Sequence, residues 1–422
     1  MSYQSTLDYI HKVQWRGQKP GLDRIIPLLE FLGNPHKRLK FVHIGGTNGK
    51  GSTSAMVESV LRNAGYHTGL YTSPFINRFN ERIRVNGKEI GDEELEELVD
   101  TIRPFADTME DLPTEFELIT AVAMAYFAQR NCDIVVMEVG LGGEFDATNV
   151  IPCPEVAVLT AIGLDHTAVL GPTIADIART KCGIIKPGCD VVSYGHEPEA
   201  DQVIEEVCAQ KDAKLWPVDF NRLTSKEVTL DHRTFDYGPF TDLKLPLLAK
   251  YQPKNAAVAI TALTALAHRG WHITPENIHD GLEAVEWPGR FELLGQHPTF
   301  LLDGSHNPQG MAATVESLQE LFPGEKFVFL LSMMADKDVD SMLQLLLPLG
   351  EQFFTVTANI SRAMPAQELA EKLKALGAQA ESCSSIQEGV RAAEGAAGFD
   401  GRVCALGTLY FSCDVRTAFQ ST

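Results

Sequence analysis

Short apolar runs alternate with stretches of helical periodicity along most of the chain. The first half contains four predicted strands, at residues 41–44, 67–71, 134–137 and 156–160, and three predicted helices, at residues 50–64, 115–130 and 174–181. Strands that alternate with helices are typical of βαβ units, whose strands run parallel. The first half is therefore expected to form a parallel sheet covered by helices.

The second half repeats this alternation after a polar interruption. Residues 215–237 alternate between polar and apolar side chains, which predicts hairpins in a small antiparallel edge, and residues 254–268 predict a long alanine-rich helix. Pro and Gly cluster at 287–298, where a domain boundary is favoured. We therefore expect three parts, which are a first domain at 1–289, a linker at 290–298 and a smaller α/β domain at 299–422.

Composition narrows the class of protein. A chain of 422 residues is longer than one hydrophobic core usually serves. With 44% hydrophobic and 22% charged residues, the chain has the profile of a globular rather than a disordered protein. Its formal charge of -20 argues against non-specific binding to nucleic acid, which needs a basic surface. A site for an anionic substrate must therefore be locally positive.

The sequence also indicates the cellular compartment of the protein. No stretch approaches the roughly 18 consecutive apolar residues of a membrane helix, and residues 1–17 lack the apolar centre and cleavage site of a signal peptide. The eight cysteines occur singly, without a CxxC pair, which favours reduced thiols over a disulfide framework. We expect a cytoplasmic protein that binds neither nucleic acid nor a membrane.

A glycine-rich segment, from Gly45 to Thr53, joins the first predicted strand to the first predicted helix. Glycines let backbone N–H groups close around phosphate oxygens, and the start of a helix favours an anion. Lys50 is therefore expected at the β- and γ-phosphates of a nucleotide. The expected nucleotide contacts are Gly46, Thr47, Asn48, Gly49, Lys50, Gly51 and Ser52. A glycine-rich turn without a ligand is the alternative.

Two more polar residues follow predicted strands. Glu138 ends the apolar run at 134–137, and His166 comes shortly after the run at 156–160. Ligands of a parallel sheet gather at the carboxyl ends of its strands, and a carboxylate there suits a nucleotide-bound Mg²⁺. Taken singly, Glu138 also fits an ordinary exposed acid at a strand end, and a lone histidine is more often structural than a ligand.

The phosphate loop has an unusual spacing. The common P-loop has four residues between its first glycine and the Gly-Lys pair, whereas Gly45 and Gly49 enclose three. This shortened GTNGKGS loop resembles that of the Mur ligase superfamily, and in particular of folylpolyglutamate and dihydrofolate synthases. The resemblance implies an α/β fold with a P-loop-containing, Mur-ligase-like ATPase domain and a smaller Rossmann-like C-terminal domain.

The same resemblance assigns metal ligands. The EVGLGG run that begins at Glu138, the LDH run that ends at His166 and the TSP run around Ser73 are similar to family motifs. It implies that Ser73, Glu138 and His166 bind two Mg²⁺ ions. It also implies that Lys181 is carbamylated by CO₂ and supports the second ion. The alternative for Lys181 is a lysine at the last turn of a helix, where the dipole favours it.

The second half carries further family motifs. The DGSHNP run at 303–308 resembles the family's DGAHNP, which implies that Asp303 contacts the nucleotide and that His306 lies near the transferring phosphate. By the same resemblance Asn255 contacts the nucleotide, and Arg290 reaches the ATP phosphates when the domains close. The alternative for Asp303 or Asn255 is a helix cap.

The expected folate side of the site also rests on resemblance. Gly21, Leu22 and Arg24 lie in a GLDRI run similar to the family's GLERI, and Phe116 lies in a similar TEFE run, where the ring would stack near the pterin. A core aromatic at a helix start is the alternative for Phe116. Asp146 belongs to GGEFDATN, which departs from the GGRLDATN common in members that also act on dihydropteroate.

These features predict an ATP-dependent ligase. The expected reaction adds L-glutamate to the γ-carboxylate of tetrahydrofolate polyglutamates through an acyl phosphate, with Lys50, Lys181, Arg290 and His306 as catalytic residues. Addition of glutamate to dihydropteroate stays open because Glu144 stands where an arginine is common. A Mur-type ligase for another carboxylate and a P-loop NTPase without ligase activity are the alternatives. A monomer is expected.

Overall fold

A computed structural model of the chain describes residues 2–13 and 21–421. Residues 1 and 14–17, which are part of the segment expected to lack a signal peptide, lie outside the described residues. The chain divides into two compact units. The first unit contains residues 1–223, 237–243 and 254–285, and the second contains residues 224–236, 244–253 and 286–422. The expected boundaries at 289 and 299 stay predictions.

The first unit is built on a sheet of eight strands in the order β4-β3-β2-β5-β1-β6-β7-β8. The strands are β1 (Phe41–Gly45), β2 (Thr68–Tyr71), β3 (Ile83–Val85), β4 (Lys88–Glu89), β5 (Ile134–Glu138), β6 (Val156–Leu159), β7 (Asp190–Ser193) and β8 (Lys214–Pro217). From β2 to β8 the paired strands are parallel, whereas β3 pairs antiparallel with both β2 and β4. The parallel sheet expected from the apolar runs is confirmed.

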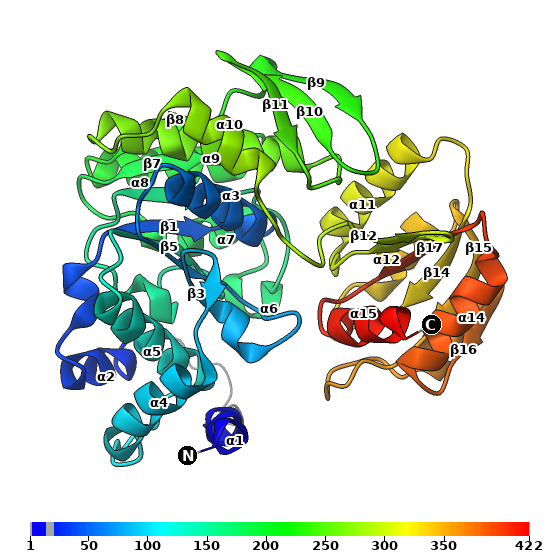
Figure 1. Ribbon diagram of the computed structural model, residues 1–422, viewed down its shortest axis with the longest axis horizontal. Helices are drawn as coiled ribbons and strands as arrows, with labels where there is room; N and C mark the ends of the chain where they lie inside the picture. Colours follow the sequence, from blue (N-terminus) through cyan, green and yellow to red (C-terminus); the bar gives the residue numbers. More distant parts are fainter. Residues whose placement is uncertain (1, 14–20, 422) are drawn as a thin grey trace. The chain divides into compact units, whose positions relative to one another are not determined.

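Helices cover both faces of this sheet (Figure 1). The helices are α1 (Tyr3–Val13), α2 (Ile25–Phe31), α3 (Lys50–Asn63), α4 (Asp92–Ala106), α5 (Glu115–Gln129), α6 (Thr167–Leu170), α7 (Ile174–Lys181), α8 (Pro198–Gln210), α9 (Gln252–His268) and α10 (Pro275–Glu283). Short 3₁₀ turns include η2 (Pro35–Arg38), η3 (Phe79–Arg82) and η4 (Ala147–Val150). A sheet covered on both faces needs apolar side chains on both, which is why its central strands are continuous apolar runs.

Two cores lie on one face of this sheet, since Met137 and Ala157 are both register partners of His43. Val135 and Met137 of β5 pack with α4 and α5, and Ala157 and Leu159 of β6 pack with α7 and α8. Helix α3 lies against β1, β2 and β5 on the opposite face (Figure 1). The carboxyl ends of these strands meet at one edge, and the phosphate loop joins β1 to α3 at that edge.

Helix α3 is packed unusually tightly. Its residues from Gly51 to Leu61 are buried, and α10 approaches it at Gly281. An added Cβ at Gly281 would lie 2.5 Å from the Cα of Val60, so only glycine fits there. The hydroxyl of Ser59 donates to the carbonyl oxygen of Gly281 at 2.7 Å and ties the two helices together.

The second unit contains a six-stranded sheet in the order β12-β13-β17-β14-β15-β16. The strands are β12 (Glu292–Gln296), β13 (Thr299–Leu302), β14 (Phe327–Leu331), β15 (Gly350–Thr355), β16 (Ala380–Ser382) and β17 (Arg402–Leu406). The helices are α11 (Pro308–Leu321), α12 (Val339–Leu346), α13 (Ala366–Ala375), α14 (Ile386–Ala397) and α15 (Ser412–Gln420). On β14, Phe329 faces a core with α11 to α13, and Leu330 faces a core with α14 and α15.

Two segments differ from expectation. The expected linker at 290–298 contains β12, which pairs antiparallel with β13 and so adds an edge to the second sheet. The expected antiparallel edge at 215–237 contains β8, a parallel edge strand of the first sheet, and the first two strands of a separate three-stranded sheet. That sheet has the order β11-β10-β9 and consists of β9 (Leu223–Val228), β10 (Arg233–Tyr237) and β11 (Phe240–Leu245).

The expected α/β class with parallel sheets is confirmed in both units. All eight cysteines lie in the described part of the chain, and all are free thiols. Among the described residues, none of the helices has both the length and the apolar character that crossing a bilayer requires.

Candidate active site

The phosphate loop has no room for side chains at two of its glycines. Gly46 has a φ of 145°, and an added Cβ would lie 1.9 Å from Oγ1 of Thr160. Gly49 has a φ of 89° and precedes α3, and its added Cβ would lie 2.6 Å from Oδ1 of Asn255. Both glycines therefore adopt a backbone that other residues rarely tolerate. The loop is shaped for the close approach of its backbone to a ligand.

The loop is fastened to the segment that follows β6. The N–H of Thr47 donates to the carbonyl oxygen of Ala161 at 2.8 Å. The Thr47 hydroxyl donates to the carbonyl oxygen of Gly163 at 3.1 Å and accepts from the N–H of the same residue at 3.1 Å. Asn48 forms a β-bridge with Ala161. These bonds hold the loop beside the segment that leads to His166.

Two lysines point at one carbonyl oxygen of the loop. Nζ of Lys50 donates to the carbonyl oxygens of Gly46 and Thr47, both at 3.2 Å. Nζ of Lys181, from the last turn of α7, donates to the same Gly46 oxygen at 2.7 Å. Burial, with a contribution from the charge of Lys50, lowers the pKa of Lys181 to about 7. A large fraction of Lys181 is therefore a neutral amine near pH 7.

Residues at the start of α3 complete the loop. Gly51 and Ser52 are buried in its first turn, where backbone N–H groups have no partner within the helix and attract an anion. Asn255 of α9 is buried beside Gly49. The structure thus brings together the nucleotide-contact residues that the sequence predicts in the first unit.

Glu138 and Ser73, two predicted metal ligands, are neighbours. Glu138 is buried at the end of β5, and its Oε2 accepts a hydrogen bond from the backbone N–H of Ser73 at 3.0 Å. The segment after Ser73 is folded around Glu81. The carboxylate of Glu81 accepts from the backbone N–H groups of Ile76, Asn77 and Arg78. Sequence reasoning missed Glu81, since nothing near it marks it as the anchor of this segment.

His166, the third predicted ligand, directly precedes helix α6 and adopts the left-handed conformation, with a φ of 50°. Its backbone N–H donates to Oδ1 of Asp165 at 2.8 Å, and its side chain is 35% exposed. Within residues 2–13 and 21–421, no group of three or more His, Cys, Asp or Glu side chains is arranged for a metal ion. One buried carboxylate at a strand end nevertheless suits Mg²⁺, which keeps phosphate and water ligands.

The loop after Glu138 is packed between Phe116 and Asp146. An added Cβ at Gly140 would lie 2.6 Å from Cζ of Phe116 and 3.1 Å from Oδ2 of Asp146. The Phe116 ring also lies 5.9 Å from the ring of Tyr71. Phe116 is therefore held beside the glycine loop, which leaves both its predicted substrate role and its packing role open.

Asp146 accepts several hydrogen bonds that stabilise the surrounding loop, a role that the sequence did not indicate. Its buried carboxylate accepts from the N–H of Leu141 at 2.8 Å, and from the N–H and hydroxyl of Thr148 at 3.0 and 2.5 Å. Thr148 in turn bonds to Nε2 of His43 at 2.8 Å inside the sheet. Burial raises the pKa of Asp146, and these hydrogen bonds oppose that rise. The predicted contact of Asp146 with substrate stays a prediction.

The predicted folate segment at 21–24 also serves the fold. Arg24 is buried, and its guanidinium forms ion pairs with Glu117 at 2.8 Å and with Asp111 at 3.1 Å. Glu117 also accepts from the N–H of Thr114 and closes the capping box of α5. Gly21 has a φ of 129°, and Leu22 packs against the core beside α5.

A cation among aromatic rings lies nearby and was missed from sequence. The guanidinium of Arg82, at the end of η3, lies 5.3 Å from the ring of Phe75 and 5.0 Å from that of Phe79. It pairs with Glu115 at 3.3 Å, while its Nε is buried without a hydrogen-bond partner. His11 contacts the other oxygen of Glu115 at 3.2 Å. No local motif marks these residues, because they are far apart in the sequence.

In the second unit, Asp303 organises the predicted residues around it. Asp303 is fully buried. Its Oδ2 accepts from the N–H of Phe291 at 2.8 Å, and its Oδ1 accepts from the N–H of Ser305 at 2.9 Å and the hydroxyl of Thr314 at 2.9 Å. Phe291 follows Arg290 and Ser305 precedes His306, so Asp303 fixes the backbone next to both.

The side chains of Arg290 and His306 are both half-buried. An added Cβ on Gly304 would lie 3.2 Å from a guanidinium nitrogen of Arg290, which therefore covers this glycine. Nδ1 of His306 lies 2.8 Å from the carbonyl oxygen of Gly304. A carbonyl oxygen only accepts, so Nδ1 carries the proton when the imidazole is neutral.

Comparisons with known proteins identify the family of the chain. Residues 44–263 match the Mur ligase middle domain, and residues 289–409 match the glutamate ligase domain of Mur ligases. The chain is 36% identical over 432 residues to a dihydrofolate synthase/folylpolyglutamate synthase of Bacillus subtilis, covering 98% of each chain. It is 39% identical over 355 residues to the folylpolyglutamate synthase of Lacticaseibacillus casei, covering 81% of this chain and 82% of that one.

A solved structure has the same fold. Mycobacterium tuberculosis folylpolyglutamate synthase in complex with ADP superposes with a TM-score of 0.91, at 30% identity and with coverage of 99% of this chain and 98% of the other. The resemblance first noted in the GTNGKGS loop therefore extends through both units. The chain belongs to the folylpolyglutamate synthase/dihydrofolate synthase family of Mur ligases.

Proposed function

We propose that this protein is an ATP-dependent ligase that adds L-glutamate to the γ-carboxylate of tetrahydrofolate polyglutamates. The observation that carries the proposal is the convergence of Lys50 and Lys181 on the carbonyl oxygen of Gly46, in a glycine loop at the start of a buried helix. This places the cationic Lys50 where the anionic phosphates of a nucleotide need positive charge in an acidic protein, and it places Lys181 beside the same loop. Relatives that span most of the chain are named for folate ligase activities.

The nucleotide is held by the loop and its surroundings. The backbone from Gly46 to Ser52 surrounds the phosphates, Lys50 neutralises the β- and γ-phosphates, and Asn255 contacts the nucleotide beside Gly49. From the second unit, Arg290 is proposed to supply a second cation and His306 is proposed to act at the transferring phosphate. Asp303 positions both, since its hydrogen bonds fix the backbone next to each.

Two Mg²⁺ ions are proposed at the edge of the first sheet. Glu138 and Ser73 would hold the first, and His166 would hold the second. Mg²⁺ neutralises phosphate charge during transfer. The adjacency of Glu138 and Ser73 and the strand-end position of Glu138 support the assignment.

Lys181 is proposed to be carbamylated. Its neutral amine attacks the carbon of CO₂, so that a nitrogen–carbon bond forms, one carbon–oxygen π bond breaks and one proton leaves, which converts the neutral amine into a carbamate anion. A pKa near 7 makes the neutral amine available, because the unshifted pKa of a lysine is far higher. The carbamate then supports the second Mg²⁺.

The reaction proceeds in two transfers. A carboxylate oxygen of the folate attacks the γ-phosphorus of ATP, the bond from that phosphorus to the bridging β-γ oxygen breaks, and ADP leaves. The amine of glutamate attacks the acyl phosphate carbon, phosphate leaves, and the amine proton is released. Lys50 and Arg290 neutralise charge during the first transfer, so catalysis rests on positioning and electrostatics.

The folate is proposed to bind near Phe116 and the segment at 21–24. Arg24 and Asp146 act by holding helix α5 and the loop after Glu138, in view of their buried hydrogen bonds. Arg82 adds a cation among aromatic rings in this part of the unit. Glutamate addition to dihydropteroate is a second candidate activity, although Glu144 offers no cation to grip its carboxylate.

Phosphate release provides the test. Purified protein with ATP, Mg²⁺ and glutamate should release phosphate only when tetrahydrofolate is present, and mass spectrometry should show products longer by one glutamate. Lys50→Ala should abolish both signals. ATP hydrolysis independent of glutamate would favour a P-loop NTPase, and turnover on another carboxylate but not on folate would favour a different Mur-type ligase. Dihydropteroate in the same assay tests the second activity.

Other expectations remain predictions. The protein acts on small molecules as a cytoplasmic monomer, without nucleic acid or membrane partners. Free thiols at all eight cysteine positions are compatible with a reducing compartment. Size-exclusion chromatography with light scattering tests the monomer.

A further inference from the structure

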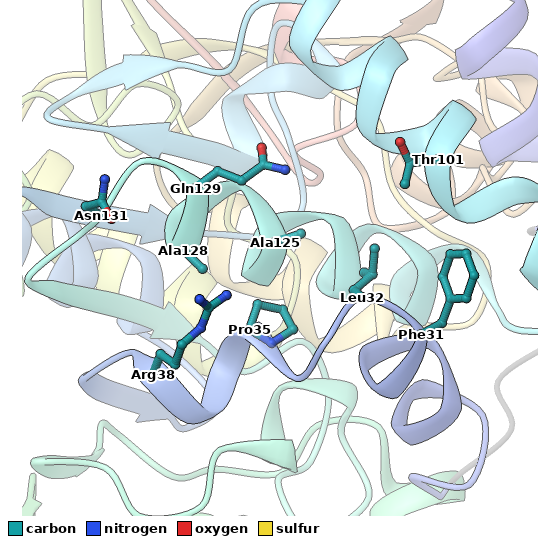
Figure 2. Close-up of a pocket in the computed structure, with 9 residues that line it drawn as sticks. All are labelled: Phe31, Leu32, Pro35, Arg38, Thr101, Ala125, Ala128, Gln129 and Asn131. Carbon is teal, nitrogen blue, oxygen red and sulfur yellow. The ribbon is translucent and has the colours of Figure 1, made fainter.

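A pocket of about 560 Å³ opens on the first unit between the segment α2–η2 and the helices α4 and α5 (Figure 2). Its volume is in the range of small-molecule sites, which are about 300–1,000 Å³. Figure 2 shows Arg38 reaching toward Pro35 and Ala128 at one end, and Phe31 and Thr101 at the other end. None of the residues that line it is assigned to the reaction above.

The pocket is separate from the candidate active site. Helix α5 begins beside Phe116 and ends at Gln129, which lines the pocket. A helix rises 1.5 Å per residue, so the 15 residues of α5 separate its two ends by about 20 Å. Helix α2 also runs from the predicted folate segment to the pocket. Arg24 directly precedes its first residue, and its last residue, Phe31, lines the pocket.

One end of the pocket is polar and cationic. Arg38, Gln129 and Asn131 line it with exposed side chains. In the described part of the chain, no hydrogen bond or ion pair is formed by any of these three side chains. An arginine without an acidic partner is notable in a chain of net charge -20. The neighbouring Lys37, which is also exposed, adds to the local positive charge.

The remaining wall of the pocket is apolar, and part of it consists of short side chains. Leu32 and Pro35 form one side, and the short side chains Ala125 and Ala128 on α5 leave the space that a ligand ring would fill. Phe31 is 48% exposed although its ring stacks on that of Phe105, with centroids 4.7 Å apart and planes inclined by 6°. The outer face of this fixed ring is therefore available for stacking.

We propose that this pocket binds a small monoanion with a flat apolar body, such as an aromatic carboxylate. The guanidinium of Arg38 is planar and pairs with a carboxylate through two parallel hydrogen bonds. Gln129 and Asn131 offer amide donors beside it. The apolar body lies on Leu32, Ala125 and Ala128 and extends toward Phe31.

Binding is tested with 2-naphthoate as the probe and 2-naphthamide as its neutral match, by calorimetry and ligand-observed NMR. Arg38→Gln removes the charge from an exposed side chain, and Thr101→Phe places a larger side chain at the Phe31 end of the pocket, from an exposed position on α4. Arg391→Gln is the matched control, because Arg391 is an exposed arginine of α14 without an ion pair in the described part of the chain. Circular dichroism confirms that each variant is folded.

We expect 2-naphthoate to bind with a Kd below about 1 mM, a free energy of about −4 kcal/mol. Arg38→Gln and the neutral probe should each weaken binding at least tenfold, Thr101→Phe should abolish it, and Arg391→Gln should leave it unchanged. Binding should persist with saturating tetrahydrofolate and in Lys50→Ala, since neither Lys50 nor the residues proposed to bind folate line the pocket. Absence of binding to the wild type, equal binding by Arg38→Gln, or displacement by tetrahydrofolate would each overturn the proposal.

Discussion

Nζ of Lys181 donates to the carbonyl oxygen of Gly46 at 2.7 Å, from a position that is almost fully buried. The same oxygen accepts from Lys50 at 3.2 Å. Two amines on one oxygen repel each other when both are charged, which favours the neutral form of Lys181. This contact therefore links the phosphate loop to the protonation state of Lys181, at the end of α7.

Lys181→Met should stabilise the protein at pH 6.5 in CO₂-free buffer while it abolishes turnover. Burial lowers the pKa of Lys181 to about 7, whereas the unfolded chain keeps a pKa near 10.4. The cost of burying the lysine is largest below pH 7 and falls as pH rises, because the unfolded state then binds more protons. Differential scanning calorimetry should show a Tm higher by about 2 °C or more at pH 6.5, and a smaller gain at pH 9. An equal gain at both pH values would contradict the shifted pKa.

Carbamylation of Lys181 gives a direct spectroscopic prediction. With ¹³C-bicarbonate, a carbamate signal should appear at pH 8, weaken at pH 6 and be absent in Lys181→Met. Neutral amine is required for the attack on CO₂, and lower pH removes it. Lys186→Met serves as the control, because burial lowers the pKa of Lys186 as well but its amine lies near the carbonyl oxygen of Asn149 instead. Retention of the signal in Lys181→Met would place the carbamate elsewhere.

Gly49→Ala should weaken ATP binding at least tenfold and destabilise the protein. Gly49 has a φ of 89°, and its added Cβ meets Oδ1 of Asn255 at 2.6 Å. Gly65 has the same φ of 89° with open space around it, so Gly65→Ala measures the backbone strain alone, about 1 kcal/mol. Calorimetric titration with ATP and urea denaturation compare the two variants. Equal nucleotide affinity in both variants would mean that the loop is not the phosphate site.

Arg24→Met should cost about 3–5 kcal/mol of stability, because Glu117 then stays buried without its partner. The double variant Arg24→Met/Glu117→Gln should recover much of the loss, since glutamine keeps the capping box of α5. Urea denaturation measures each free energy. If Arg24 only supports the fold, the KM for tetrahydrofolate in the double variant should be within about threefold of wild type. A KM that stays tenfold higher would show that Arg24 binds substrate directly.

His43 should make the protein sensitive to mild acid. Burial lowers its pKa to about 3, while the unfolded chain titrates near 6.5. Between these values the unfolded state binds one more proton, so the free energy of unfolding falls by about 1.4 kcal/mol per pH unit on acidification. His43→Leu should reduce the slope measured between pH 6 and 4 by about that amount. His272→Gln, at an exposed position, should leave the slope unchanged.

Sequence patterns predicted those parts of the site that are formed by residues close together in the chain. The strand, glycine loop and helix from Phe41 to Asn63 are one continuous segment, and β1 and α3 lie within a residue of their predicted ends. Glu138 was found for the same reason, as a carboxylate directly at the end of an apolar run. Helix α7 was predicted with its observed bounds, because its apolar periodicity follows Thr173, whose side chain caps it.

Other features depend on partners distant in the chain. Arg24 is paired with residues 87 and 93 positions away, so the sequence around it cannot distinguish a structural arginine from a substrate ligand. The role of Asp146 depends on the backbone N–H groups of Leu141 and Thr148, which carry no sequence signal. Strand β12 was expected as linker because Pro and Gly flank it, yet its pairing with β13 overrides that local tendency.

The tight packing of α3 limits which segments of the first unit can move when a nucleotide binds. A helix buried from Gly51 to Leu61 and touching α10 at Gly281 without a side chain between them cannot slide or tilt without breaking many contacts at once. The free and nucleotide-bound proteins should therefore share this helix as a fixed frame of reference. Within the first unit, any rearrangement that accompanies turnover is then expected around Ser73 and Gly163, which are held by hydrogen bonds to Glu138 and Thr47.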